Sequence, residues 1–80
     1  MWYFILKQDE LKPEPYRALQ KKAALTEVEP FNEPYENLCL FSVDDYASFV
    51  DALDLEGLRY EVMSHRPTRE ELLEGQKDRG

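Results

Sequence analysis

A strand followed at once by an amphipathic helix is encoded by residues 38–57, which read LCLFSVDDYASFVDALDLEG. The segment Leu38–Val43 is almost wholly apolar, as expected of a strand in the centre of a sheet. Asp44 or Asp45 can cap the following helix, and Gly57 is its natural stop. The apolar side of this helix follows the i, i+3, i+4, i+7 spacing, in Tyr46, Phe49, Val50 and Leu53.

Further patterned segments lie on both sides of this unit. Trp2–Lys7 is rich in aromatic and β-branched residues and predicts a second central strand. A helix is predicted to begin at Pro15, because proline suits the first helical turn. Leu25–Glu29 and residues 58–63 alternate between apolar and polar types, which is typical of edge strands.

The order strand, helix, strand, strand, helix, strand predicts an α+β fold, the ferredoxin-like βαββαβ sandwich, with two helices on one face of an antiparallel sheet. Right-handed crossovers place the first and third strands in the centre and the other two at the edges. Residues 1–67 are expected to form this domain. Residues 68–80 are expected to add a short helix, which begins with a Thr68/Glu71 capping box, and a frayed tail from Gly75.

The sheet face without the two helices is predicted to be apolar, and the alternation of the strands defines its members. Such a face is rarely left open in a monomer. We expect it to be covered by the C-terminal helix through Leu72 and Leu73, by a second copy of the chain or by a partner protein. If the strand residues were shifted by one position, the two faces of the sheet would be exchanged. The predicted face consists of Tyr3, Ile5, Lys7, Leu25, Leu38, Leu40, Arg59, Glu61 and Met63.

A protein partner or a homodimer is the expected ligand of this surface. The loop at residues 30–36 adds two prolines, which stiffen it, and two aromatic side chains, which offer contact area at low entropic cost. These aromatic side chains could instead fold back onto the sheet edge. The predicted partner-binding residues are Tyr3, Ile5, Leu38, Leu40, Met63, Phe31 and Tyr35.

Charge is unevenly distributed in this 80-residue chain of net charge −7. Residues 23–58 contain nine acidic residues and neither lysine nor arginine, which disfavours direct nucleic-acid binding. The strand Leu38–Val43 also lacks the basic residue and the glycine expected of an RNA-recognition motif. An acidic surface of Glu27, Glu29, Asp44, Asp45, Asp51 and Asp54 suggests an alternative function, mimicry of a phosphate backbone to inhibit a nucleic-acid-binding protein.

Signals for catalysis are weak, and no catalytic residue, metal site or cofactor is predicted. His65 is the one histidine and could act as a general base in a small dimeric enzyme, which is the third hypothesis. Cys39, the one cysteine, is expected to be a small buried hydrophobic residue. A non-enzymatic, regulatory protein-binding module is therefore the favoured interpretation, and enzymatic activity stays open. The single thiol and the lack of a long apolar run suggest a cytoplasmic protein without membrane association.

Overall fold

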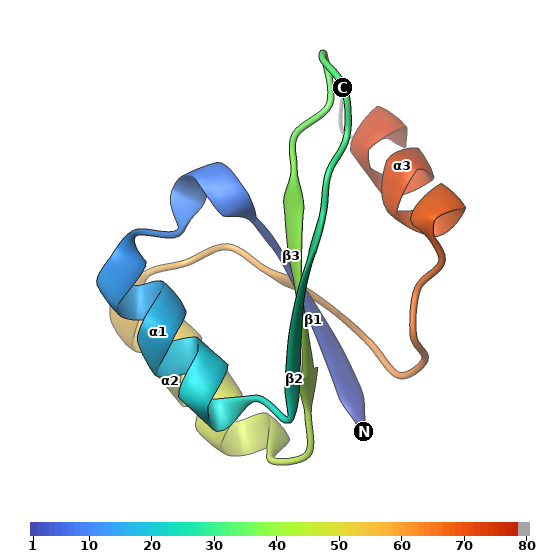
Figure 1. Ribbon diagram of the computed structural model, residues 1–80. Coiled ribbons are helices and arrows are strands. Elements are labelled where there is room, and N and C mark those ends of the chain that lie inside the picture. The colour runs from blue at the N-terminus through green and yellow to red at the C-terminus, as the bar shows by residue number, and fades with distance from the viewer. Residues whose placement is uncertain (79–80) are drawn as a thin grey trace.

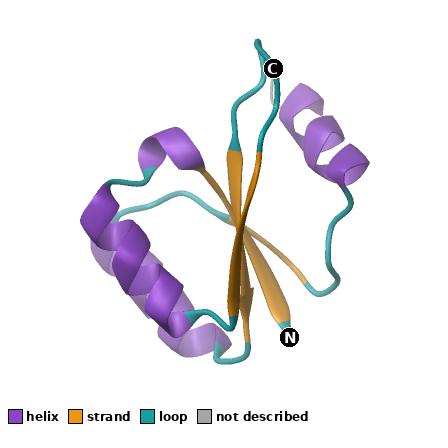
Figure 2. Cartoon of the chain, in the orientation of Figure 1, coloured by secondary structure: helices purple, strands orange, loops and turns teal. Residues whose placement is uncertain are grey.

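The structure, a computed structural model, describes residues 1–78. This part of the chain is an α+β protein with a four-stranded antiparallel sheet and three α-helices (Figure 1). Helices α1 and α2 cover one face of the sheet and α3 lies on the other, as the purple helices in Figure 2 show. In chain order the elements are β1 (Trp2–Lys7), the 3₁₀ turn η1 (Gln8–Glu10), α1 (Pro13–Lys22), β2 (Leu25–Glu29), β3 (Leu38–Val43), α2 (Tyr46–Glu56), β4 (Glu61–Met63) and α3 (Arg69–Asp78).

The strands are ordered β2-β3-β1-β4 across the sheet, and all neighbours are antiparallel. The predicted placement of β1 and β3 in the centre and of β2 and β4 at the edges is therefore confirmed. Phe4 of β1 pairs with Phe41 of β3, and Ile5 pairs with Leu40. Because successive strand residues point to opposite faces, these two pairs belong to different layers of the molecule.

The larger core lies between the sheet and helices α1 and α2. Phe4, Phe41 and Phe49 are completely buried there, and the rings of Phe4 and Phe49 are 4.7 Å apart. Leu19 of α1 and Leu53 of α2 complete the contact with the sheet. The predicted parity of the strands is confirmed, because the alternate residues of both central strands meet the helices on this side.

Local signals set the ends of α1 and α2. The Asp45 side chain accepts a hydrogen bond from the Ser48 N–H at 3.2 Å, as a helix cap does. Gly57 ends α2 with φ +66°, a conformation that favours glycine. The predicted start of α1 at Pro15 is wrong, since the helix begins at Pro13. Pro13 itself suits the first turn, and Lys12 before it is extended.

A second, smaller core forms on the face of the sheet opposite α1 and α2. Leu72 of α3 is 6% exposed and packs with Ile5, Leu38 and Leu40 of the central strands. Tyr3, Phe31 and Met63 are half-buried around this group. Of the three covers that the sequence allowed, the C-terminal helix is the one that lies on this face.

Two element boundaries differ from those expected. β4 contains Glu61–Met63 rather than residues 58–63, since pairing with β1 is limited to these three residues. The Leu58 N–H instead donates to the Leu53 carbonyl of α2 at 3.1 Å. The chain was predicted to fray from Gly75 onward, but α3 continues past this glycine and is helical through Asp78. The rest of that predicted tail, residues 79–80, lies outside the described residues.

Candidate functional site

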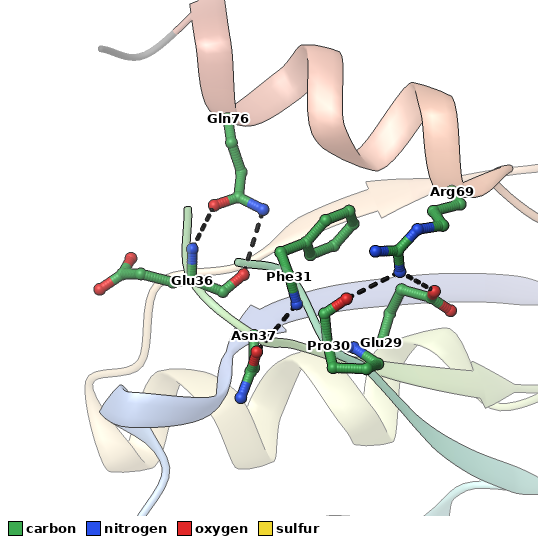
Figure 3. Close-up of polar contacts among 7 residues, drawn as sticks. All are labelled: Glu29, Pro30, Phe31, Glu36, Asn37, Arg69 and Gln76. Atoms are coloured by element: carbon green, nitrogen blue, oxygen red, sulfur yellow. Dashed lines mark hydrogen bonds and ion pairs between the residues drawn. The ribbon is translucent and has the colours of Figure 1, made fainter. Parts of the chain in front are cut away.

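The first turn of α3 is fastened to the end of β2. The guanidinium of Arg69 pairs with the Glu29 carboxylate and donates to the Pro30 carbonyl at 2.7 Å (Figure 3). It also lies 4.3 Å from the centre of the Phe31 ring, within the range of a cation–π contact. One arginine thus links α3 to the edge of the sheet and to the 30–36 loop.

The last turns of α3 are fastened to the other end of the same loop. The Gln76 side-chain amide accepts from the Glu36 N–H at 2.8 Å and donates to the Glu36 carbonyl at 3.1 Å (Figure 3). This pair of bonds satisfies the backbone of Glu36 much as a neighbouring strand would. The loop is therefore held at both ends by α3.

The base of the 30–36 loop is held by Asn37. Its side-chain oxygen accepts from the Phe31 N–H at 2.9 Å, and its side-chain amide donates to Gln8 at 3.2 Å. The Gln8 N–H in turn donates to the Asn37 carbonyl at 3.0 Å. These bonds position Phe31 beside α3, where it joins the smaller core.

The segment between β4 and α3 crosses the sheet face from one edge to the other. Arg66 of this segment pairs with Glu27 of β2 at 2.5 Å, and the next residue, Pro67, is buried. A hydrogen bond from Arg66 lowers the pKa of Glu27, and the same bond raises the pKa of Arg66. We call residues 64–69 the strap, since both of its arginines are paired with glutamates of β2.

The predicted capping box opens α3. The Thr68 hydroxyl accepts from the Glu71 N–H and the Glu71 carboxylate accepts from the Thr68 N–H, both at 3.1 Å. Glu71 also contacts His65 at 3.0 Å on the surface, where the His65 side chain is 60% exposed. The hydrogen bonds from His65 and Thr68 lower the pKa of Glu71. His65 therefore contributes to the attachment of α3.

A cleft of about 450 Å³ remains between α3 and the β1–β4 half of the sheet face. We call it the α3 cleft. On the sheet side it is lined by Ile5, Leu38, Glu61 and Met63. Its volume falls within the range typical of ligand sites, about 300–1,000 Å³. Leu72 buries Ile5, Leu38 and Leu40 of the central strands, whereas Met63 and Glu61 of β4 stay partly or fully exposed beside the helix.

The α3 side of the cleft carries most of its charge. Glu70, Glu71 and Glu74 line it together with Leu72 and Gly75. A smaller cleft of about 290 Å³ adjoins it where β4 begins, shares Ile5, Leu38 and Glu61 with it, and is lined by both basic and acidic residues. The larger cleft thus combines an apolar floor with an acidic wall.

Most of the predicted partner-binding residues are brought together on this face. Ile5, Leu38 and Leu40 are buried under Leu72, with Tyr3, Met63 and Phe31 half-buried around them. Tyr35 is half-buried elsewhere in the loop, where its N–H closes a turn with the Asn32 carbonyl at 3.0 Å. Of the buried three, only Ile5 and Leu38 line the α3 cleft.

The predicted acidic surface is divided in the structure. Glu27 and Glu29 are paired with the strap arginines on β2, and Asp45 caps α2. Asp44, Asp51 and Asp54 are exposed at or on α2, across the sheet from the α3 cleft. The acids therefore do not form a single continuous row.

The remaining candidates for chemistry are accounted for by burial and geometry. Cys39 is completely buried in β3, and this burial raises the pKa of its thiol to about 11, so the reactive thiolate is suppressed. Within residues 1–78, no group of three or more histidine, cysteine, aspartate or glutamate side chains is placed to hold a metal ion. The same residues contain no helix that is long and apolar enough to span a bilayer.

Acid is expected to loosen the strap. Because the pKa of Glu27 in the folded state lies below its ordinary value of 4.5, its pairing with Arg66 adds stability above about pH 4.5. That contribution is lost as the pH falls through the folded-state pKa, and Glu71 follows the same direction. The protection factors of the α3 amides, which compare each measured exchange rate with the intrinsic rate at the same pH, should fall between pH 6 and pH 3. Glu27→Gln should flatten this dependence, and an unchanged pH profile in that variant would contradict the prediction.

The residues that attach α3 could not be found from the sequence. Arg69 and Gln76 each bind a residue 40 positions earlier in the chain, and no local pattern reports such a pairing. Comparisons of the chain with protein-family models, with curated proteins and with solved structures gave no match.

Proposed function

We propose that the protein is a small, non-enzymatic protein-binding module of ferredoxin-like βαββαβ topology, with a regulatory role in the cytoplasm. The contact surface in this proposal is the α3 cleft together with the 30–36 loop. The observation that carries it is the cleft of about 450 Å³ beside Leu72, in which half-buried Met63 and the exposed glutamates of α3 stay accessible over a buried apolar floor. The strand order β2-β3-β1-β4 supports the topology, and the one buried thiol is compatible with a reducing compartment.

A fixed loop and a fixed helix favour binding over catalysis. The cleft is bordered by side chains that hydrogen bonds already hold in place, so a partner would meet an ordered surface and lose little entropy there. His65 is exposed and engaged with Glu71, which supports a structural role over that of a general base. Mimicry of a phosphate backbone would have fewer unpaired carboxylates to use, because Glu27 and Glu29 are paired with arginines. Both alternatives remain hypotheses.

Site-specific photo-crosslinking in the cells that express the protein tests the proposal. A photoreactive phenylalanine analogue is placed at Met63, a half-buried residue on the sheet side of the cleft, and its adducts are identified by mass spectrometry. The matched control carries the same analogue at Leu55, which is 86% exposed on α2. We expect a discrete protein adduct from position 63 that is absent from position 55.

The outcomes of this experiment separate the hypotheses. An adduct with a second copy of the chain would make the partner a homodimer. Adducts from position 55 alone would favour the acidic surface of α2 as the contact. Equal, diffuse labelling at both positions, with circular dichroism showing a folded protein, would refute a binding surface at the cleft.

A further inference from the structure

Gly75 occupies a helical position that gives no reason for a glycine. It lies inside α3, and among the amino acids only proline is less favourable than glycine in the interior of a helix. A Cβ atom at this position would meet no atom within 4 Å, so close packing does not exclude a larger residue. Its backbone also lacks the positive φ that distinguishes Gly57. What the missing side chain does provide is space, because Gly75 lines the α3 cleft.

The wall beside Gly75 carries unbalanced negative charge. Glu70 and Glu74 are both exposed, one turn apart on α3, and both line the cleft. Glu74 pairs with Lys77 at 3.4 Å, and its side chain is 65% exposed. Among the described lining residues of this cleft there is no lysine or arginine. A cationic ligand is therefore favoured over a neutral or anionic one.

The protein already binds a segment of this chemistry on the same sheet face. The strap presents Arg66 and Arg69 to glutamates of β2, and Pro67, which lies between them in the sequence, is buried. The β2–β3 half of the face thus accepts basic side chains around an apolar anchor. The α3 cleft offers the same combination, an apolar floor on the sheet and carboxylates that come mostly from α3.

From these three observations we propose that the α3 cleft binds a basic segment of a partner protein through an apolar anchor residue, and that Gly75 keeps the cleft open for that anchor. The proposal rests on the function proposed above and specifies the chemistry of the partner. The basic residues of that segment face Glu70 and Glu74, and its apolar side chain enters over Ile5 and Met63.

Nuclear magnetic resonance titration of the full chain with short synthetic peptides tests this chemistry. The probes are a peptide of alternating arginine and leucine, one of alternating glutamate and leucine, and one of alternating arginine and serine. We expect the arginine–leucine probe alone to shift the amide signals of Ile5, Met63 and Gly75 in a saturable manner. The absence of such shifts, or equal binding of the arginine–serine probe, would overturn the proposal.

Two variants at one position separate the filling of the cleft from the stabilisation of the helix. Gly75→Leu raises helix propensity and places a large side chain in the cleft, so it should weaken probe binding at least about tenfold. Gly75→Ala also favours the helix but adds only one methyl group, and it should retain most of the binding. Equal binding by wild type and Gly75→Leu would show that the probe sits elsewhere.

Two double variants test whether binding requires the negative charge of the cleft. The double variant Glu70→Gln and Glu74→Gln should weaken probe binding by about twofold to thirtyfold, as expected for two exposed ion pairs. The double variant Asp51→Asn and Asp54→Asn makes the same change in net charge on α2 and should bind as wild type does. If the crosslink at position 63 forms but withstands Gly75→Leu, the binding function stands and the inference about the cleft fails. If no crosslink forms, the function itself fails.

Discussion

Replacing Phe41 by alanine is expected to lower the free energy of unfolding by about 3–5 kcal/mol, the range for a large aromatic residue removed from a core. Phe41 is completely buried in β3, and its ring lies 5.4 Å from that of Phe49 and 6.0 Å from that of Tyr16. It therefore connects the sheet to both α1 and α2. An 80-residue domain has a total stability of about 4–12 kcal/mol, so the variant should be largely unfolded or close to it.

Urea denaturation followed by circular dichroism measures this effect. The control is Leu55→Ala, since Leu55 is apolar but 86% exposed on α2 and its loss should change stability by less than about 0.5 kcal/mol. Phe41→Leu, which keeps part of the volume, should fall between the two. A loss below about 1 kcal/mol for Phe41→Ala would mean that the three aromatic rings do not form the main core.

The sequence predicted the larger core well because each of its signals is local. Strand residues two apart share a face, and helix residues three and four apart share a side, so Phe4, Phe41 and Phe49 could be assigned to one layer. The caps at Asp45 and Thr68 also lie within three residues of their partners. Such patterns need no knowledge of which segments meet in space.

The cover on the opposite face could not be predicted in the same way. Leu72 and Leu73 offered too little apolar surface to choose between α3, a second copy and a partner protein. The choice depends on Arg66, Arg69 and Gln76, which bind residues 39 or 40 positions away. The same contacts explain why Gly75 does not end the helix, because Gln76 is held by the Glu36 backbone in the turn that follows.

The α3 cleft was outside the reach of sequence patterns for a further reason. Its existence depends on the attachment of α3 to β2 through Arg69 and on the late start of β4 at Glu61, neither of which alternation reports. Residues 58–60 keep the alternating pattern of a strand, yet Leu58 and Tyr60 pack against the larger core without pairing to β1. The sequence therefore named the apolar face correctly but could not say where beside α3 a cleft would remain.

Replacing Leu72 by alanine is expected to release α3 while the larger core stays folded. Leu72 is the buried apolar contact of this helix, and truncation of a buried leucine costs about 2–5 kcal/mol. The polar contacts that remain, through Arg69 and Gln76, are exposed or half-buried and contribute only about 0–1 kcal/mol each. They cannot hold the helix alone, because its interior also contains Gly75 and isolated helices of this length are marginal in water.

Hydrogen exchange and dye binding distinguish this local release from global unfolding. Amides at residues 72–77 should lose protection in Leu72→Ala, and binding of a hydrophobic dye should rise as Ile5, Leu38 and Leu40 become accessible. Amides of Phe4 and Phe41 should stay protected, since their side chains face the other core. Leu73→Ala, at a half-buried neighbour, should show a smaller change. If the amides of β1 and β3 lost protection together with those of α3, the two cores would be one cooperative unit. A partner could then not displace the helix without unfolding the sheet.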